Sequence, residues 1–317
     1  MNEGATIERR GRISRRAALA GAAALAAGGA RAAGRAAPGP LPVGLQLYSI
    51  NQSLDADFDG ALKTVAGIGY KYVELAGLHG RTPAQARAAF DGLGLKCPSA
   101  HFPPDDWVKG SREPIAIAKA VGASTVVCPM PPIPERLRHR ASTGAQTGLA
   151  AAYDGMTLAD WKAFAALLNR LGADARAAGL TFAYHNHNID FRDLGGGRRP
   201  IDVVLSETDP KLVDLEVDLG WVKAAGHDPA EFLERHASRI TLVHLKDLKP
   251  TAPNFGFQMA PTELGSGVID WQRVLAAVRK TRTRYGFVEQ EPPYAIPQLQ
   301  SAKISFDYLA KLQGGVA

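Results

Sequence analysis

From residue 43 to residue 291 the chain alternates short β-prone runs with longer segments whose apolar residues recur every three or four positions. The β-prone runs cover residues 43–50, 70–77, 95–102, 124–130, 180–188, 212–222, 240–247 and 285–291. Eight strands that alternate with helices predict a (β/α)8 TIM barrel, here a single domain over residues 43–317. A doubly wound sheet is the alternative. It is disfavoured because no Gly-rich dinucleotide-binding motif follows any of the runs.

The first 32 residues differ from the rest in composition. A basic stretch precedes a run of Ala, Leu and Gly, which ends at a cleavage-site-like Ala30-Arg31-Ala32. The segment SRRAAL at residues 14–19 resembles a twin-arginine export signal, which implies a periplasmic protein that folds before export. An amphipathic or disordered extension is the alternative. Residues 33–42 read as a Pro/Gly linker, and no membrane span is expected once the signal is removed.

Net charge argues against a nucleic-acid-binding protein. The formal charge of the whole chain is +6, but residues 1–32 hold six Arg and two acidic residues. Without that net +4 the remaining chain carries only +2. A near-neutral domain lacks the basic surface that binding to a phosphate backbone requires.

The chain has two cysteines, Cys97 and Cys128, and they do not form a CxxC or Cys/His zinc motif. A disulfide is one alternative in an oxidising compartment. The two residues fall at opposite ends of neighbouring predicted strands, and this placement disfavours such a bond. We therefore expect two buried free thiols.

A long connection, residues 131–156, follows the fourth predicted strand and is rich in Pro, Gly and basic residues. In a barrel it would lie at the C-terminal face of the strands, where active sites are built. A functional cover and a disordered insertion are both compatible with its composition.

Polar residues gather at the C-terminal ends of the predicted strands. Because side chains alternate between the two faces of a strand, His185 and His187 share one face, opposite the aromatic row of Phe182 and Tyr184. The same rule turns further polar residues toward the barrel axis: Glu74, His101, Asp214, Glu216, Asp218, His244, Lys246, Glu289 and Glu291.

Four of these residues, on four consecutive strands, have the chemistry of a metal site. His185, Asp218, His244 and Glu289 offer two imidazoles and two carboxylates. Such a mixed nitrogen and oxygen set suits Mn²⁺ first, with Co²⁺, Zn²⁺ or Fe²⁺ as alternatives, and suits Ca²⁺ or Mg²⁺ less well. Inward carboxylates are costly to bury without a cation. Taken singly, each residue could be a satisfied hydrogen-bonding group; together they predict one divalent metal ion.

The motifs that carry these residues resemble the sugar phosphate isomerase/epimerase superfamily, also called xylose isomerase-like TIM barrels. The matching segments are GLQLYSI, YVELAG, AYHNHNIDF, EVDLGWV, HLKD, LGSGVIDW and FVEQE. The resemblance implies one divalent ion held by a strand-five residue (often Glu), a strand-six Asp, a strand-seven His and a strand-eight Glu. These fall on His185, Asp218, His244 and Glu289. Strand five departs from the family pattern, and His187 is the alternative ligand there.

The resemblance also implies a reaction in which a proton is removed from the carbon next to a carbonyl. Glu289 is then a candidate base, and His101 and Lys246 are candidate acid/base or oxyanion partners. Glu74 would bind substrate hydroxyls or neutralise Lys246.

Four more residues are expected to bind a small-molecule sugar substrate: His187, Trp221, Gln46 and Tyr48. For Trp221 the alternative is packing beneath a loop, and for Gln46 and Tyr48 it is barrel filling.

Several functions remain open at this point. The leading hypothesis is a metal-dependent sugar isomerase or epimerase, and the second is a lyase that cleaves 3-keto-glycosides by β-elimination, which a strand-five histidine would suit. An endonuclease of the same superfamily is opposed by the near-neutral charge and the export signal. A periplasmic sugar- or metal-binding protein is the non-enzymatic alternative. A homo-oligomer is compatible with the sequence.

Overall fold

A computed structural model describes Met1, residues 39–141 and residues 146–314 of the chain. Apart from Met1, the predicted export signal and most of the predicted linker lie outside this part. Among the described residues, no helix combines the length and the apolar character needed to cross a membrane.

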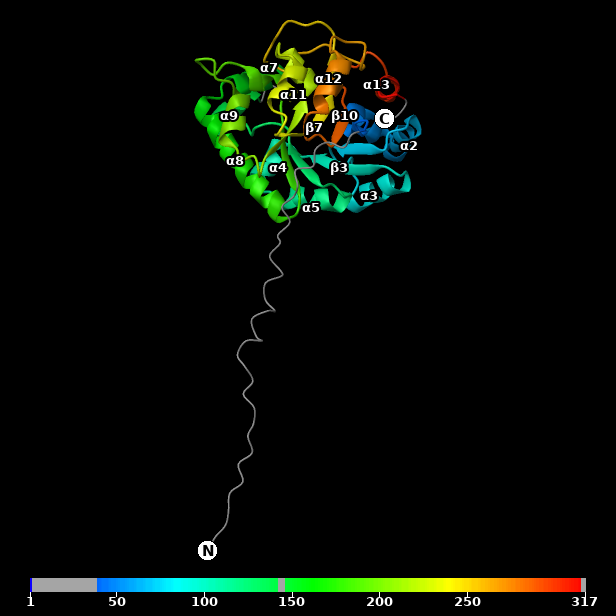
Figure 1. Ribbon diagram of the computed structural model, residues 1–317, viewed down its shortest axis with the longest axis horizontal. Coiled ribbons are helices and arrows are strands. Elements are labelled where there is room, and N and C mark those ends of the chain that lie inside the picture. The colour runs from blue at the N-terminus through cyan, green and yellow to red at the C-terminus, as the bar shows by residue number, and fades with distance from the viewer. Residues whose placement is uncertain (2–38, 142–145, 315–317) are drawn as a thin grey trace. The chain divides into compact units, whose positions relative to one another are not determined.

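Eight parallel strands close into a barrel, and helices surround it (Figure 1). The strands are β1 (Val43–Gln46), β2 (Tyr72–Leu75), β3 (Lys96–His101), β4 (Thr125–Cys128), β5 (Thr181–His185), β6 (Asp214–Asp218), β7 (Ile240–Leu245) and β10 (Tyr285–Val288). Their order around the barrel is β1-β10-β7-β6-β5-β4-β3-β2, so each strand pairs with its neighbours in sequence and β1 closes against β10. The predicted (β/α)8 barrel is confirmed, and every β-prone run contains one strand.

The helices follow the strands as the periodicity predicted. They are α1 (Asn51–Ala56), α2 (Phe58–Ile68), α3 (Pro83–Gly92), α4 (Pro104–Lys109), α5 (Arg112–Val121), α8 (Leu158–Ala177), α9 (Pro200–Glu207), α10 (Leu219–Ala224), α11 (Pro229–Arg235), α12 (Trp271–Val278) and α13 (Gln298–Leu312). Short 3-10 helices η1 (Leu47–Ile50) and η3 (Asn188–Phe191) follow β1 and β5. Side chains cap several helix starts: Asp228 accepts from the backbone N–H of Glu231, and Asp270 from that of Arg273.

The long connection after β4 is more regular than its composition suggested. Its described part forms η2 (Glu135–Leu137), α6 (Arg138–Ala141) and α7 (Gln146–Asp154). The Tyr153 hydroxyl donates to the carbonyl of Pro131 at 2.8 Å and so ties α7 back to the end of β4. The described residues of this connection are therefore not an unstructured insertion.

An apolar layer fills the barrel axis directly below the polar strand ends. It consists of Val127, Ala183, Leu242 and Phe287, all buried. Three of them stand two residues before His185, His244 and Glu289 in sequence. Because side chains on a strand alternate with period two, the strands that supply the apolar layer also supply the polar layer above it.

One buried carboxylate organises the loop before α12. Asp247 lies in the two-residue strand β8 (Asp247–Leu248), which pairs with β9 (Pro261–Thr262) in antiparallel orientation. Its Oδ2 accepts from the backbone N–H groups of Gly265 and Gly267 and from the indole of Trp271, and its Oδ1 from the N–H groups of Leu248 and Ile269. A Cβ at Gly267 would lie 2.0 Å from Oδ1, so this approach requires glycine. The LGSGVIDW motif is thus a loop wrapped around one aspartate.

Both cysteines are free and buried, as predicted. Cys97 donates weakly to the carbonyl of Ser99, and Cys128 to that of Met130.

Candidate metal centre and active site

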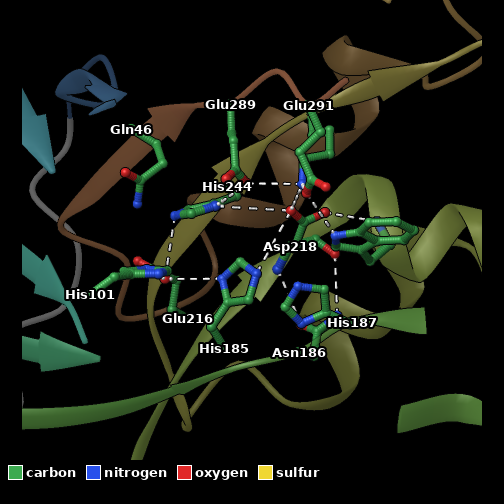
Figure 2. Close-up of polar contacts among 12 residues, drawn as sticks. Gln46, His101, His185, Asn186, His187, Glu216, Asp218, His244, Glu289 and Glu291 are labelled. Atoms are coloured by element: carbon green, nitrogen blue, oxygen red, sulfur yellow. Dashed lines mark hydrogen bonds and ion pairs between the residues drawn. The ribbon is translucent and has the colours of Figure 1, made fainter. Parts of the chain in front are cut away.

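The strand ends bring together most of the polar residues that the sequence singled out. The residues that converge inside the C-terminal end of the barrel are Glu74, His101, His185, Asp218, His244, Lys246 and Glu289. Figure 2 shows five of them: His101, His185, Asp218, His244 and Glu289. All are buried except His101, which is partly exposed. Each lies within one residue of the C-terminal end of its strand, where inward alternation leaves it facing the axis.

The four predicted metal ligands form one cluster. One ligand atom from each of His185, Asp218, His244 and Glu289 lies within 4.8 Å of the others. Asp218 Oδ2 is 4.0 Å from His185 Nε2 and 3.9 Å from His244 Nδ1, and His244 Nδ1 is 2.7 Å from Glu289 Oε2. Separations of this size between donor atoms leave room for an ion at their centre after small side-chain adjustments.

A further residue, Glu216, was not among the predicted site residues although it belongs to the site. Its Oε2 is 2.5 Å from His101 Nε2, 3.0 Å from His185 Nδ1 and 3.3 Å from His244 Nε2. With those three histidines it forms a second group that could hold a metal ion. Glu216 stands two residues before Asp218 on the same inward face, so strand alternation alone was sufficient to find it.

Each of the two shared histidines lies between opposing carboxylates. Figure 2 shows the His185 ring between Glu216, on its Nδ1 side, and Asp218, on its Nε2 side. His244 is held in the same way, with Nε2 at 2.6 Å from Glu74 and Nδ1 at 2.7 Å from Glu289. Metal binding requires a neutral imidazole, which has one N–H and one lone pair, so each ring would then donate toward one carboxylate and offer its lone pair on the other side. The two possible metal-binding groups share His185 and His244 and therefore compete for the lone pairs of these rings.

The charges of the site are unbalanced among the described residues. Lys246 is the only Lys or Arg that these carboxylates contact there: its Nζ is 2.8 Å from Asp218 and 2.9 Å from Glu289, and it also pairs with Glu291. Against the cost of burial, these three carboxylates hold the pKa of Lys246 well above its usual value. Gly220 makes room for this lysine, since a Cβ there would lie 2.8 Å from Lys246 Cγ.

The pKa values of the buried acids reflect this crowding. Burial, then the charge of Glu216, raises the pKa of Glu74 to about 7, and burial and Glu289 raise that of Asp218 to about 6. Burial and the neighbouring His244 lower the pKa of His185 to about 3, which keeps it neutral and able to bind a metal.

The donor set fits a divalent cation. One oxygen each of Glu74 and Glu216 is buried without a hydrogen-bond partner among the described residues. Glu216 and Glu289 outweigh burial and raise the pKa of His244 well above its usual value, so this ring would release a proton on binding a cation. Two imidazoles and two carboxylates match the preferences of Mn²⁺, Zn²⁺, Co²⁺ and Fe²⁺, and a positive charge at their centre would relieve the repulsion between the acids.

A cavity of about 660 Å³ opens above the cluster. Seven of the residues predicted for catalysis, metal binding, substrate binding or the strand-end row line it: Gln46, Tyr48, His101, His185, His187, Glu289 and Glu291. The other predicted catalytic, metal-binding and substrate-binding residues, Glu74, Asp218, Trp221, His244 and Lys246, are buried and do not line it. Gln46 is fixed by donating to Glu74 at 2.8 Å and accepting from the N–H of Tyr48.

His187 faces the cavity from the turn into η3. Its backbone N–H donates to Asp190 at 2.7 Å, and Asp190 also accepts from the Tyr184 hydroxyl. Burial lowers the pKa of His187 well below its usual value, so the ring is neutral. Its Nδ1 has no partner among the described residues, which leaves it available to a ligand.

Trp221, predicted to contact substrate, is not among the residues that line the cavity. α10 begins immediately after Asp218, whose Oδ1 caps it by accepting from the Trp221 N–H at 2.7 Å. The helix turns the indole under the site, where Lys246 lies 5.1 Å from its ring centre and its Nε1 donates to Glu291 at 3.2 Å. Trp221 therefore packs beneath the site, which was the alternative to substrate contact.

The profile of the xylose isomerase-like TIM barrel family matches residues 62–312, and the chain belongs to this family. Its curated relatives include an inosose dehydratase of Geobacillus thermodenitrificans, 34% identical over 155 residues that cover 44% of this chain and 50% of the relative. An inosose dehydratase of Clostridium perfringens is 26% identical over 202 residues, which cover 61% of this chain and 64% of the relative. The chain thus spans about half the length of the curated relatives it matches.

Solved structures share the fold. A sugar phosphate isomerase/epimerase from Parabacteroides distasonis superposes with a TM-score of 0.70 at 21% identity, covering 89% of this chain and 97% of that one. The IOLI protein with a bound zinc atom gives 0.62 at 14% identity, covering 87% and 99%. A barrel protein from Mycobacterium smegmatis in complex with magnesium gives 0.60 at 14%, covering 87% and 98%.

Proposed function

We propose that this protein is a divalent-metal-dependent enzyme that removes a proton from the carbon next to a carbonyl group in a sugar or sugar derivative, leading to isomerisation or epimerisation. The observation that carries the proposal is the cluster of His185, Asp218, His244 and Glu289 on the floor of a cavity. The bound zinc and magnesium of two proteins with the same fold support it.

The proposed chemistry divides between the cluster and the residues around it. A divalent cation held by the four side chains would polarise the substrate carbonyl and acidify the adjacent carbon, and Mn²⁺ is our first choice. Glu289 accepts the proton as a carboxylate, because Lys246 and His244 outweigh the effect of burial and keep its pKa well below the usual value. His101, from the far side of the barrel, donates a proton. Glu74 and Glu216 hold its pKa above the usual value against the effect of burial.

Proton exchange tests the reaction directly. The protein is stripped of metal, reloaded with Mn²⁺, Zn²⁺, Co²⁺ or Mg²⁺, and incubated in D₂O with a ketose and with a cyclic keto-polyol. We expect metal-dependent uptake of deuterium at the carbon next to the carbonyl, seen by NMR. The variant Glu289→Gln should lose this exchange. Absence of exchange with every metal would contradict the proposal, and sugar binding without exchange would indicate a binding protein.

Elimination is the second candidate, because the curated relatives are named inosose dehydratase. The first step is the same: the base takes the α-proton. The electron pair then forms a carbon–carbon double bond and expels the β-substituent, which takes a proton from His101 and leaves as water or, from a 3-keto-glycoside, as an alcohol. An unsaturated ketone absorbs in the near ultraviolet and an epimer does not. Absorbance during the exchange experiment therefore decides between the two outcomes.

A further inference from the structure

The cavity above the site has two chemically different sides. The acids and histidines that line it come largely from β5 and from the segment after β10, with Gln46 and His101 completing the floor from β1 and β3. The segments that follow β2, β3 and β4 line it with apolar side chains. These strands are neighbours in the barrel, so the apolar residues form one continuous side.

Four side chains on the apolar side keep surface open to the cavity. Leu78, Ile117, Met130 and Leu149 are only partly buried and pack against the core with their inner faces. They belong to four separate elements: the segment after β2, helix α5, the segment after β4 and helix α7. Apolar surface that lines a concave site is the usual mark of a ligand-binding wall.

Phe257 adds a further apolar side chain to the cavity lining, next to His187. Its ring lies 5.5 Å from the His187 ring and 5.6 Å from the Tyr153 ring. Its backbone has a φ of +60°, a left-handed conformation that is unfavourable for an aromatic residue. The surroundings enforce it: the Phe257 N–H donates to Asn188 at 3.1 Å, and Asn188 donates to Asn254 at 2.7 Å. Strain held in place at a cavity wall points to a role in binding.

The lining has a marked bias in charge. Among the described residues that line the cavity there is no Lys or Arg, while Glu289, Glu291 and Asp106 are acidic. Asp106 is paired with Lys109 at 3.1 Å. Recognition of a phosphate group depends on Arg, Lys or exposed backbone N–H groups, and the carboxylates would repel it.

We infer that the substrate is an unphosphorylated sugar derivative that carries an apolar substituent of about the size of an aromatic ring. The sugar part lies over the acids and histidines, and the substituent lies against Ile117, Met130 and Leu149. The inference rests on the proposed function, since it assigns the sugar part to that site. A cavity of about 660 Å³ falls within the range of roughly 300–1,000 Å³ that holds ligands larger than one sugar ring.

Unreactive ligands test this substrate class without turnover. Phenyl and methyl β-D-glucopyranoside have no carbonyl group, so proton removal cannot occur, and calorimetry with the Mn²⁺-loaded protein gives their dissociation constants. We expect the phenyl glucoside to bind at least about tenfold more tightly, from burial of its ring. Fructose 6-phosphate should bind more weakly than fructose. Equal affinity for the two glucosides, or tighter binding of the phosphate, overturns the inference.

Two isoleucines provide matched variants. Ile117→Ala should reduce the preference for the phenyl glucoside about threefold to tenfold and leave the affinity for the methyl glucoside unchanged. Ile304→Ala, on the exposed face of α13, should change neither. Leu149→Ala serves as a second test if the first variant is unstable. A preference that survives both cavity variants contradicts the inference.

Deuterium exchange separates this inference from the proposed reaction. Metal-dependent exchange without a phenyl preference would leave the reaction standing and the substrate class wrong. A phenyl preference without exchange on any keto-sugar would contradict the reaction and support the substrate class for the bound ligand.

Discussion

Asp218 and Asp247 are both fully buried aspartates near the mouth of the same barrel, and their surroundings are opposite. Asp247 accepts five hydrogen bonds from N–H groups, and none of its partners is charged. Asp218 accepts from the Trp221 N–H through Oδ1, while its Oδ2 faces Lys246, two histidines and the carboxylate of Glu289.

The comparison shows that burial of an acid does not by itself identify a catalytic site. Five aligned dipoles replace the water that Asp247 loses, so its charge is stabilised and it orders a loop. Asp218 gains few such dipoles and lies among other acids, so a cation is the natural complement of its charge. The first arrangement is structural and the second is suited to chemistry.

The largest effect is expected for Asp218→Asn. The amide oxygen can still cap α10, so the fold should persist. Loss of a ligand charge should reduce deuterium exchange about a thousandfold, since a polarising metal contributes several kcal/mol. Exchange rates and metal content of the purified variant provide the measurement. Exchange within tenfold of the unmodified protein, with metal retained, would remove Asp218 from the site.

Asp247→Asn should reduce stability and leave metal binding unchanged. The amide nitrogen would face N–H donors that now point at a carboxylate oxygen, which should lower the free energy of unfolding by about 2–4 kcal/mol. Denaturant titration measures the loss. Metal stoichiometry at low temperature should be unchanged, and a variant that is fully stable yet metal-free would reverse the assignment of the two aspartates.

Glu216→Gln should weaken metal binding by about tenfold to a hundredfold, because an amide no longer orients His185 and His101 as a carboxylate does. Competition with a chelating dye measures the affinity. Glu234→Gln is the control, because Glu234 is exposed and pairs with Lys280 away from the site. If Glu216→Gln abolishes binding while Asp218→Asn does not, the metal occupies the deeper group of His101, His185, Glu216 and His244.

The last prediction concerns stability rather than activity and involves Asp190, whose pKa burial raises to about 7. The pKa of Asp190 in the folded protein exceeds the value of about 3.9 in the unfolded chain. Its contribution to the free energy of unfolding is therefore greatest below a pH of about 3.9 and is lost as the pH rises toward 7. Relative to Asp190→Asn, the unmodified protein should lose up to about 1.4 kcal/mol per pH unit across this window. Urea titrations at pH 5 and pH 7 test it, and a constant difference between the two proteins would show that Asp190 does not titrate there.

The sequence was sufficient for the fold and for the residues that face the axis. Strand periodicity is fixed by backbone geometry, so the placement of His185, Asp218 and His244 followed directly from it. Family resemblance supplied the expectation of one metal ion. Neither could show how the two nitrogens of each imidazole divide between carboxylates, because that depends on side chains from β2, β5, β6, β7 and the segment after β10.

Residues beyond the strand ends were harder to predict. The β-prone run 212–222 continues past Asp218, yet α10 begins at Leu219 and carries Trp221 beneath the site. Phe257 adopts a left-handed backbone that no residue pattern indicates, because Asn188, nearly seventy positions earlier, holds it there. Loop conformation follows from such distant contacts rather than from local propensity.

The apolar layer of Val127, Ala183, Leu242 and Phe287 also determines how molecules reach the site. It seals the barrel axis beneath His185 and His244, so traffic can pass only through the C-terminal mouth. Under the proposed function, cation, substrate and product would share one entrance, with the cation innermost. Such an enzyme would bind the cation before the substrate, and a bound substrate or product would separate the cation from the solvent.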